Sequence, residues 1–206
     1  MPPAHATEPC SRLSHWAGRT FLRLLGWRVE GAPPPVAKFV VLGAPHTSNW
    51  DLPIVLASSW ALGIRIRWLA KKELFVPGVA PLLHAMGGIP VDRAAAHGLV
   101  GELIAAFEAN DRMALMISPD GTRGRQEAWK SGFYHVALAA KVPVVASYAD
   151  FARKRSGICG SVQLTGDMPS DMDAIRDLYA GVTPRHPAQA TPIRLAAEND
   201  GAKGER

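Results

Sequence analysis

The stretch AKFVVLG at residues 37–43 decides the fold of this 206-residue chain. It is a short apolar run that follows a turn-forming break, GAPPP at residues 31–35, which is the pattern of a strand bounded by turn signals. Its apolar residues are continuous, so both faces of the strand are expected to be covered. The run MALMIS at residues 113–118 shares this continuity. Both strands are therefore predicted to lie in a largely parallel sheet with helices on its faces.

The rest of the chain repeats this alternation of strand and helix patterns. Four further strands are predicted near residues 65–70, 89–92, 142–147 and 159–165, and helices near residues 50–62, 78–86, 96–109, 130–140 and 169–180. This order predicts an α/β fold in which a single domain holds a sheet layered by helices. A hydrophobic share of 48% is ample for one buried core in a chain of this length.

A basic, aromatic-rich segment precedes the predicted domain. Residues 11–28 carry leucine, phenylalanine and tryptophan side chains among four arginines, without an acidic residue, which predicts an amphipathic helix. Such a helix can lie in the headgroup layer of a membrane, with its tryptophans buried and its arginines at lipid phosphates. It can equally pack on the core as an ordinary surface helix, and the sequence leaves both interpretations open.

Three segments follow from these patterns. Residues 1–35 are predicted to be an N-terminal amphipathic or membrane-associating segment, residues 36–182 the globular domain, and residues 183–206 a proline-containing tail that is expected to be mobile. The most apolar stretch, residues 52–64, is shorter than the ~20 residues that a membrane-spanning helix needs. The N-terminus lacks the pattern of a secretory signal, so a cytoplasmic location is expected.

The formal net charge of +5 favours anionic partners. These could be nucleic acid, a phospholipid surface or a small substrate that bears phosphate, and charge alone does not choose among them. No recognition helix or aromatic sheet motif is visible, which disfavours nucleic acid. The two cysteines, Cys10 and Cys159, are far apart and in no ligand spacing, so neither a disulfide framework nor a zinc site is indicated.

The motif HTSNWD at residues 46–51 stands where the first buried strand ends and a helix begins. On one continuous helix the offset of five residues would turn His46 and Asp51 away from each other. A loop could instead fold the histidine back onto the carboxylate, with Ser48 or Asn49 capping the helix. A histidine held in this way can take a proton from a substrate hydroxyl, because its ordinary pKa lies near the working pH. Without further context, a hydrogen-bonded loop histidine explains the pair equally well.

Three further elements could bind an anion. Arg93 emerges at the end of a short predicted strand, after a glycine pair. The loop SPDGTRGR at residues 118–125 offers exposed amides, a hydroxyl and two guanidinium groups, and its Arg123 can grip a pair of anionic oxygens. Lys130 opens the next helix pattern as another candidate contact. A surface ion pair at Arg93 and a basic, solvated turn at residues 118–125 are the alternatives.

In their order and spacing, HTSNWD, GGIPVDR at residues 87–93, PDGTR at 119–123 and KVPVV at 141–145 resemble the four blocks of the glycerolipid acyltransferases. This family includes 1-acylglycerol-3-phosphate acyltransferases and glycerol-3-phosphate acyltransferases. The resemblance covers roughly residues 36–148. It implies that residues 36–182 are an acyltransferase domain with the fold of the glycerol-3-phosphate acyltransferases.

The resemblance also implies a reaction and a site. His46 would deprotonate the hydroxyl of the acceptor and Asp51 would steady the imidazolium, while the hydroxyl oxygen attacks an acyl thioester. In the family, the second and third blocks bind the phosphate of the acceptor, a role that falls here to Arg93, Asp120, Gly121, Thr122 and Arg123. Lys130 is a further candidate for the same role. The reaction needs no metal and no organic cofactor.

The implied partners are two substrates and a membrane. The donor would be acyl-CoA or acyl carrier protein, and the acceptor a lysophospholipid-like compound, above all 1-acylglycerol-3-phosphate. An anionic membrane surface is expected as a third partner, which places the protein in the cytoplasm, peripherally associated with the inner face of the cell membrane. Nucleic acid is not expected.

The chain departs from the family pattern at several positions. Asp120 stands where the third block commonly has glutamate, and Pro45 precedes His46 where asparagine is common. The segment after Val145 reads ASYADFARK and lacks the usual proline-containing ending. These departures indicate a distinct branch and leave the true acceptor open.

Two other functions are compatible with the same motifs. The chain could be a non-catalytic, peripheral lipid-binding protein of this fold, although the joint presence of His46, Asp51, Gly121 and Arg123 argues against it. It could also hydrolyse phosphate-bearing substrates, although a metal-dependent hydrolase would need more carboxylates or histidines nearby.

Overall fold

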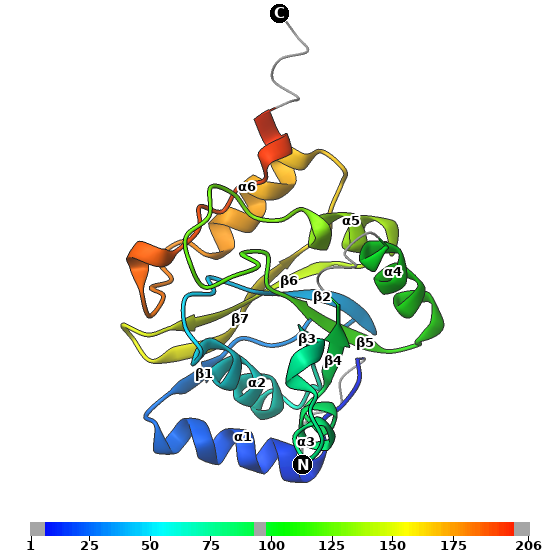
Figure 1. Ribbon diagram of the computed structural model, residues 1–206. Helices are drawn as coiled ribbons and strands as arrows, with labels where there is room; N and C mark the ends of the chain where they lie inside the picture. The colour runs from blue at the N-terminus through cyan, green and yellow to red at the C-terminus, as the bar shows by residue number, and fades with distance from the viewer. Residues whose placement is uncertain (1–6, 93–97, 200–206) are drawn as a thin grey trace, which may run out of the picture.

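Seven strands form one sheet within the part of the chain that the computed structural model describes, residues 7–92 and 98–199 (Figure 1). Their order across the sheet is β1-β7-β6-β2-β5-β3-β4. All neighbouring pairs are parallel except β6 and β7. The bounds are β1 (Arg28–Glu30), β2 (Lys38–Gly43), β3 (Arg67–Lys71), β4 (Gly88–Val91), β5 (Met113–Ile117), β6 (Val144–Asp150) and β7 (Arg155–Val162).

Helices cover both faces of this sheet, three on each (Figure 1). One face carries α1 (Arg12–Leu24), α2 (Asp51–Ala61) and α3 (Ala80–Ala85), and the other carries α4 (Leu99–Ala109), α5 (Gly132–Ala139) and α6 (Met168–Leu178). Three short 3-10 helices, η1 (Lys72–Leu74), η2 (Pro187–Gln189) and η3 (Ala196–Asn199), complete the described elements. The predicted α/β fold with a largely parallel, helix-layered sheet is confirmed.

The central strand β2 is buried on both of its faces, as the continuous apolar run predicts. Phe39 and Val41 pack in the core under α2, and Val40 and Leu42 pack in the core under α4, α5 and α6. Each of these four side chains is at most 1% exposed. Strand β2 therefore holds the two halves of the core together, and the loop that follows it begins from a rigid position.

The ends of the sheet differ from the prediction. Strand β1 was not predicted, because three residues with two charges give no apolar run, and it forms by pairing with β7. The predicted helix over residues 11–28 ends at Leu24, and Gly26 with φ of 74° turns the chain into β1. Strand β7 begins at Arg155 and not near residue 159, because a short turn joins it to β6 as an antiparallel hairpin.

Helix α1 packs on α2 through one face and exposes an apolar stripe on another. Gly18 lies so close to α2 that an added Cβ would be 2.5 Å from the backbone oxygen of Ala57. On the outer side, Leu13, Trp16 and Leu24 are 72%, 63% and 81% exposed. The helix thus packs on the core and still presents an amphipathic surface. Within residues 7–92 and 98–199, no helix combines the length and the apolar character needed to cross a bilayer.

The segment after α6, which the sequence predicts to be mobile from residue 183, is anchored to the rest of the protein as far as Glu198. Leu195 is 1% exposed and pairs with Trp129 in a parallel bridge. Arg176 of α6 binds Glu198 through an ion pair of 2.8 Å. These contacts join the segment to the helical layer above the sheet (Figure 1). Residues 200–206 of the predicted tail lie outside the described residues.

Candidate active site

The candidate site lies at the carboxyl edge of the sheet, where the loops after β2 and β5 meet. His46 comes three residues after β2 and Asp120 three residues after β5, and the two strands are parallel neighbours. The carboxyl ends of parallel strands are where ligands bind in open α/β sheets. The adjacency of β2 and β5 therefore brings together two motifs that are 74 residues apart, and the backbone N–H of His46 donates to Asp120 Oδ2 at 3.1 Å.

The loop at residues 46–51 folds back on itself. His46 Nδ1 lies 3.0 Å from Asp51 Oδ2, and the same oxygen accepts the backbone N–H groups of Thr47 and Ser48, both at 2.8 Å. The predicted caps, Ser48 and Asn49, do not occupy the N-cap position of α2, which belongs to Trp50. Asp51, the first residue of the helix, fixes the loop instead, because its carboxylate gathers the N–H groups that precede it.

This geometry defines the chemistry available to His46. The Asp51 carboxylate favours a proton on Nδ1, which leaves Nε2 with a free lone pair. The side chain of His46 is 24% exposed, whereas that of Asp51 is 9% exposed. The imidazole can therefore meet a substrate from outside while its partner stays fixed in the protein. This is the arrangement of a general base and the carboxylate that orients it.

Asp120 lies beneath the loop and not at a substrate-facing surface. It is 1% exposed, and it accepts the N–H of His46. Burial raises the pKa of the Asp120 carboxyl, and the His46 N–H and the Thr191 hydroxyl lower it by less. The sequence places Asp120 among the phosphate-binding residues; in the structure its carboxylate is buried and fixes the backbone of the loop that carries His46.

The remaining predicted residues of the third block form an exposed, cationic turn. Gly121 has φ of 68°, and its N–H donates to Ser118 O at 3.1 Å. A Cβ at Gly121 would be 2.8 Å from Lys130 Cε, so the glycine lets the lysine chain lie across the turn. Thr122, Arg123 and Lys130 are exposed. The turn therefore offers two cations and a hydroxyl to a ligand. Arg93, the other residue predicted to bind the phosphate, lies outside the described residues.

The C-terminal segment completes the site, which the sequence did not predict. The backbone N–H of His186 donates to Thr47 Oγ1 at 3.2 Å. The amide nitrogen of Gln189, in the orientation that satisfies its neighbours, donates to Thr47 O at 3.1 Å and Arg123 O at 3.2 Å. One segment thus links the loops after β2 and β5. Its prolines indicated a tail, and no local motif marked His186 or Gln189.

The comparisons with known proteins agree with this fold. A family model described as Acyltransferase matches residues 28–149, more than half of the chain, and the chain therefore belongs to the acyltransferase family. Among solved structures, the crystal structure of the 1-acyl-sn-glycerophosphate (LPA) acyltransferase PlsC from Thermotoga maritima is similar, with a TM-score of 0.58 and 18% sequence identity. The match covers 83% of this chain and 78% of that chain. No curated protein matches the chain.

The raised pKa of Asp120 predicts a pH-dependent cost to stability. Between the ordinary Asp pKa, about 3.9, and its higher value in the folded protein, the folded state keeps a proton that the unfolded chain has released. The free energy of unfolding therefore loses a contribution as pH rises through this window. Asp120→Asn cannot titrate and keeps an oxygen that accepts the His46 N–H. The free energy of unfolding of Asp120→Asn, relative to that of the wild type, should therefore increase above pH about 4 and then level off.

Urea unfolding at a series of pH values measures this difference. Asp111→Asn, which removes an exposed carboxylate just before β5, is the matched control. Parallel stability curves for Asp120→Asn and the wild type from pH about 3 to about 7 would contradict the assignment.

Proposed function

We propose that this acyltransferase moves a fatty acyl group from acyl-CoA or acyl carrier protein to the hydroxyl of a lysophospholipid-like acceptor, with 1-acylglycerol-3-phosphate as the best candidate. The observation that carries the proposal is the contact of 3.0 Å between His46 Nδ1 and Asp51 Oδ2, next to an exposed cationic turn. It supplies a base for the acceptor hydroxyl and a place for the acceptor phosphate.

The transfer step follows from the orientation of His46. Nε2 takes the proton of the acceptor hydroxyl while the oxygen attacks the carbonyl carbon of the thioester. The C–O bond forms, the C–S bond breaks, and the imidazolium returns the proton to the departing sulfur. Asp51 stabilises the imidazolium between these events, since its Oδ2 accepts the Nδ1–H.

The acceptor phosphate would bind at the turn after β5. Arg123 offers a planar fork of N–H donors, and Lys130 and the Thr122 hydroxyl are exposed beside it. We assign Arg93 to the same phosphate from its place in the second block. Asp120 and Gly121 shape the turn: Asp120 binds the neighbouring loop, and Gly121 leaves room for the lysine chain.

Helix α1 would hold the protein on an anionic membrane at the inner face of the cell membrane. Its exposed Leu13, Trp16 and Leu24 are flanked by Arg12, Arg19 and Arg23, which are exposed as well. Apolar side chains can enter the headgroup layer while arginines meet the phosphates. This contact would bring the site near the surface where lipid acceptors reside.

His46→Ala should lower acyl transfer by at least ~10²–10⁴-fold, because the general base is lost. The assay follows acylated product from labelled acyl-CoA and 1-acylglycerol-3-phosphate. His135→Ala, which removes an exposed histidine from α5, is the control. Near-normal turnover by a folded His46→Ala protein would contradict the mechanism. Thioester hydrolysis by the wild type without acylated product would favour a hydrolase.

Arg123→Ala should chiefly weaken the use of acceptors that bear a phosphate. The loss of a charge-assisted hydrogen bond should lower kcat/KM for 1-acylglycerol-3-phosphate by about 10–100-fold and leave that for an uncharged monoacylglycerol almost unchanged. Arg112→Ala, an exposed cation at the amino end of β5, is the control. Equal losses with both acceptors would give Arg123 a structural role.

Trp16→Ser should weaken binding to vesicles that contain anionic phospholipid by about tenfold or more, because the serine has no aromatic ring to bury in the headgroup layer. Co-sedimentation with the vesicles measures this. Leu138→Ser, which alters an exposed apolar residue on the opposite face of the sheet, should bind as the wild type does. Indistinguishable binding by Trp16→Ser would rule out α1 as the membrane contact.

A further inference from the structure

A hollow of about 520 Å³ lies between the C-terminal end of α1 and the loop that carries His46. Its apolar walls come from Trp27, Trp50, Ile54 and Phe151. The volume falls in the range of small-molecule sites, which are concave and mostly apolar with a few polar groups. The exposed turn with Arg123 and Lys130 does not contribute to the lining of this hollow.

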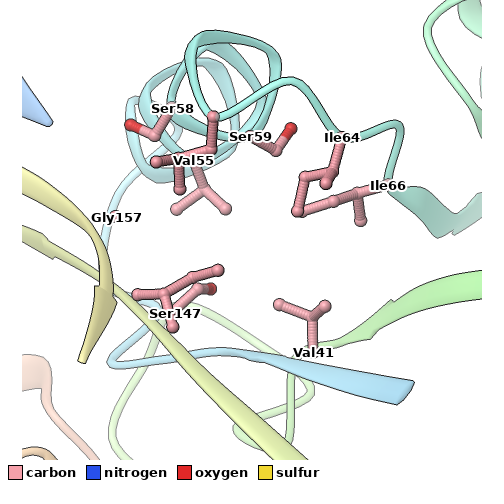
Figure 2. Close-up of a pocket in the computed structure, with 10 residues that line it drawn as sticks. Val41, Val55, Ser58, Ser59, Ile64, Ile66, Ser147 and Gly157 are labelled. Carbon is pink, nitrogen blue, oxygen red and sulfur yellow. The ribbon is translucent and has the colours of Figure 1, made fainter. Parts of the chain in front are cut away.

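The interior beneath α2 offers no comparable space. Figure 2 shows Val55 and Ile64 facing Val41 and Ser147 across a small gap between α2 and the sheet. That cavity has a volume of about 10 Å³, close to the room that one water molecule needs. In the described structure, a bulky substrate group therefore finds room in the outer hollow and not in this gap.

The hollow borders the catalytic loop directly. Trp50, which lines it, is the residue before Asp51, and His186, which also lines it, donates its N–H to Thr47 Oγ1. It lies on the β6 side of the loop, because Phe151 directly follows β6. The cationic turn of Arg123 follows β5, the neighbour of β2 on its other side. His46 therefore stands between two different binding surfaces.

Two cations face the hollow. The guanidinium carbon of Arg185 lies 5.6 Å from the centre of the Phe151 ring, and Lys154 Nζ donates to Leu25 O at 3.1 Å. Among the described residues, neither side chain forms an ion pair with an acid, and the lining of the hollow contains no carboxylate. An anionic group at this rim would meet positive charge without a competing acid.

We propose that this hollow binds the acyl donor through its phosphopantetheine arm, with Lys154 and Arg185 on the phosphate. The inference rests on the proposed function, because transfer requires both substrates at His46 at once. With the acceptor phosphate at the turn of Arg123, the hollow on the β6 side of the loop is left for the thioester. The apolar walls suit the uncharged arm, and the thiol formed when the C–S bond breaks leaves through the same hollow.

The phosphopantetheine arm is shared by CoA and by loaded acyl carrier protein, so the test uses both. CoA, acyl carrier protein with the arm and the same protein without it are titrated into wild type and Lys154→Ala/Arg185→Ala. Trp27 and Trp50 line the hollow, so tryptophan fluorescence reports binding beside calorimetry. In Lys154→Ala/Arg185→Ala, the dissociation constant for CoA, for loaded carrier protein or for both should be at least about tenfold higher than in the wild type. The probe whose dissociation constant rises, CoA or loaded carrier protein, identifies the source of the phosphate.

Arg112→Ala/Lys141→Ala is the matched control, because it removes the same two charges from exposed positions at the amino edge of the sheet. It should bind as the wild type does, and Arg185→Lys should retain most of the affinity. Equal affinities of the two double variants, or no binding of either probe to the wild type, would overturn the inference.

The two proposals fail separately in these measurements. If the protein transfers acyl groups and its affinity for the donor does not depend on Lys154 and Arg185, the donor site is wrong and the proposed reaction stands. If donor binding depends on these cations but the protein acylates no lysophospholipid, the donor site stands and the proposed acceptor is wrong.

Discussion

Three hydrogen bonds converge on Asp51 Oδ2, and the organisation of the site depends on them. His46 Nδ1 and the backbone N–H groups of Thr47 and Ser48 all lie within 3.0 Å of this oxygen. A buried carboxylate is costly unless it is hydrogen-bonded, and the N-terminus of α2 adds a favourable dipole. These contacts hold the loop with Nδ1 of His46 on the carboxylate, and the His46 side chain stays 24% exposed. An ordinary helix cap at Ser48 would satisfy the helix but would not orient the imidazole.

The position of this loop is secured from below and from the side by segments distant in sequence. Asp120 binds the His46 N–H from the loop after β5, and Gln189 joins the carbonyl groups of Thr47 and Arg123. Polar side chains held by several partners lose little further freedom when substrate binds, which favours preorganised catalysis. The C-terminal segment thus forms part of the framework of the candidate site, although the family match ends at residue 149.

The sheet order gives the site two unlike sides. Strands β5 and β6 flank β2, so the loop with His46 lies between a cationic turn and an aromatic hollow. Helix α1 packs on α2 in the opposite direction, with His15 Nδ1 2.9 Å from Trp60 O and Leu22 packed near Ile54. The exposed end of α1, at Leu24, therefore lies next to the hollow. A membrane-bound helix and a donor site at this place would bring lipid and thioester to the same base.

The sequence by itself determined the fold class, the central strands and the order of the chemical blocks. Residues 37–43 are apolar throughout because both faces of β2 are buried, and this local property is visible without a structure. Tertiary structure alone decided the rest. Strand β1 exists only by pairing with β7, Asp120 became a buried support, and Thr191, His186 and Gln189 entered the site from a segment predicted to be a mobile tail. The reason is physical: apolar periodicity records burial along one element, whereas a hydrogen bond between distant loops leaves no periodic trace in the sequence.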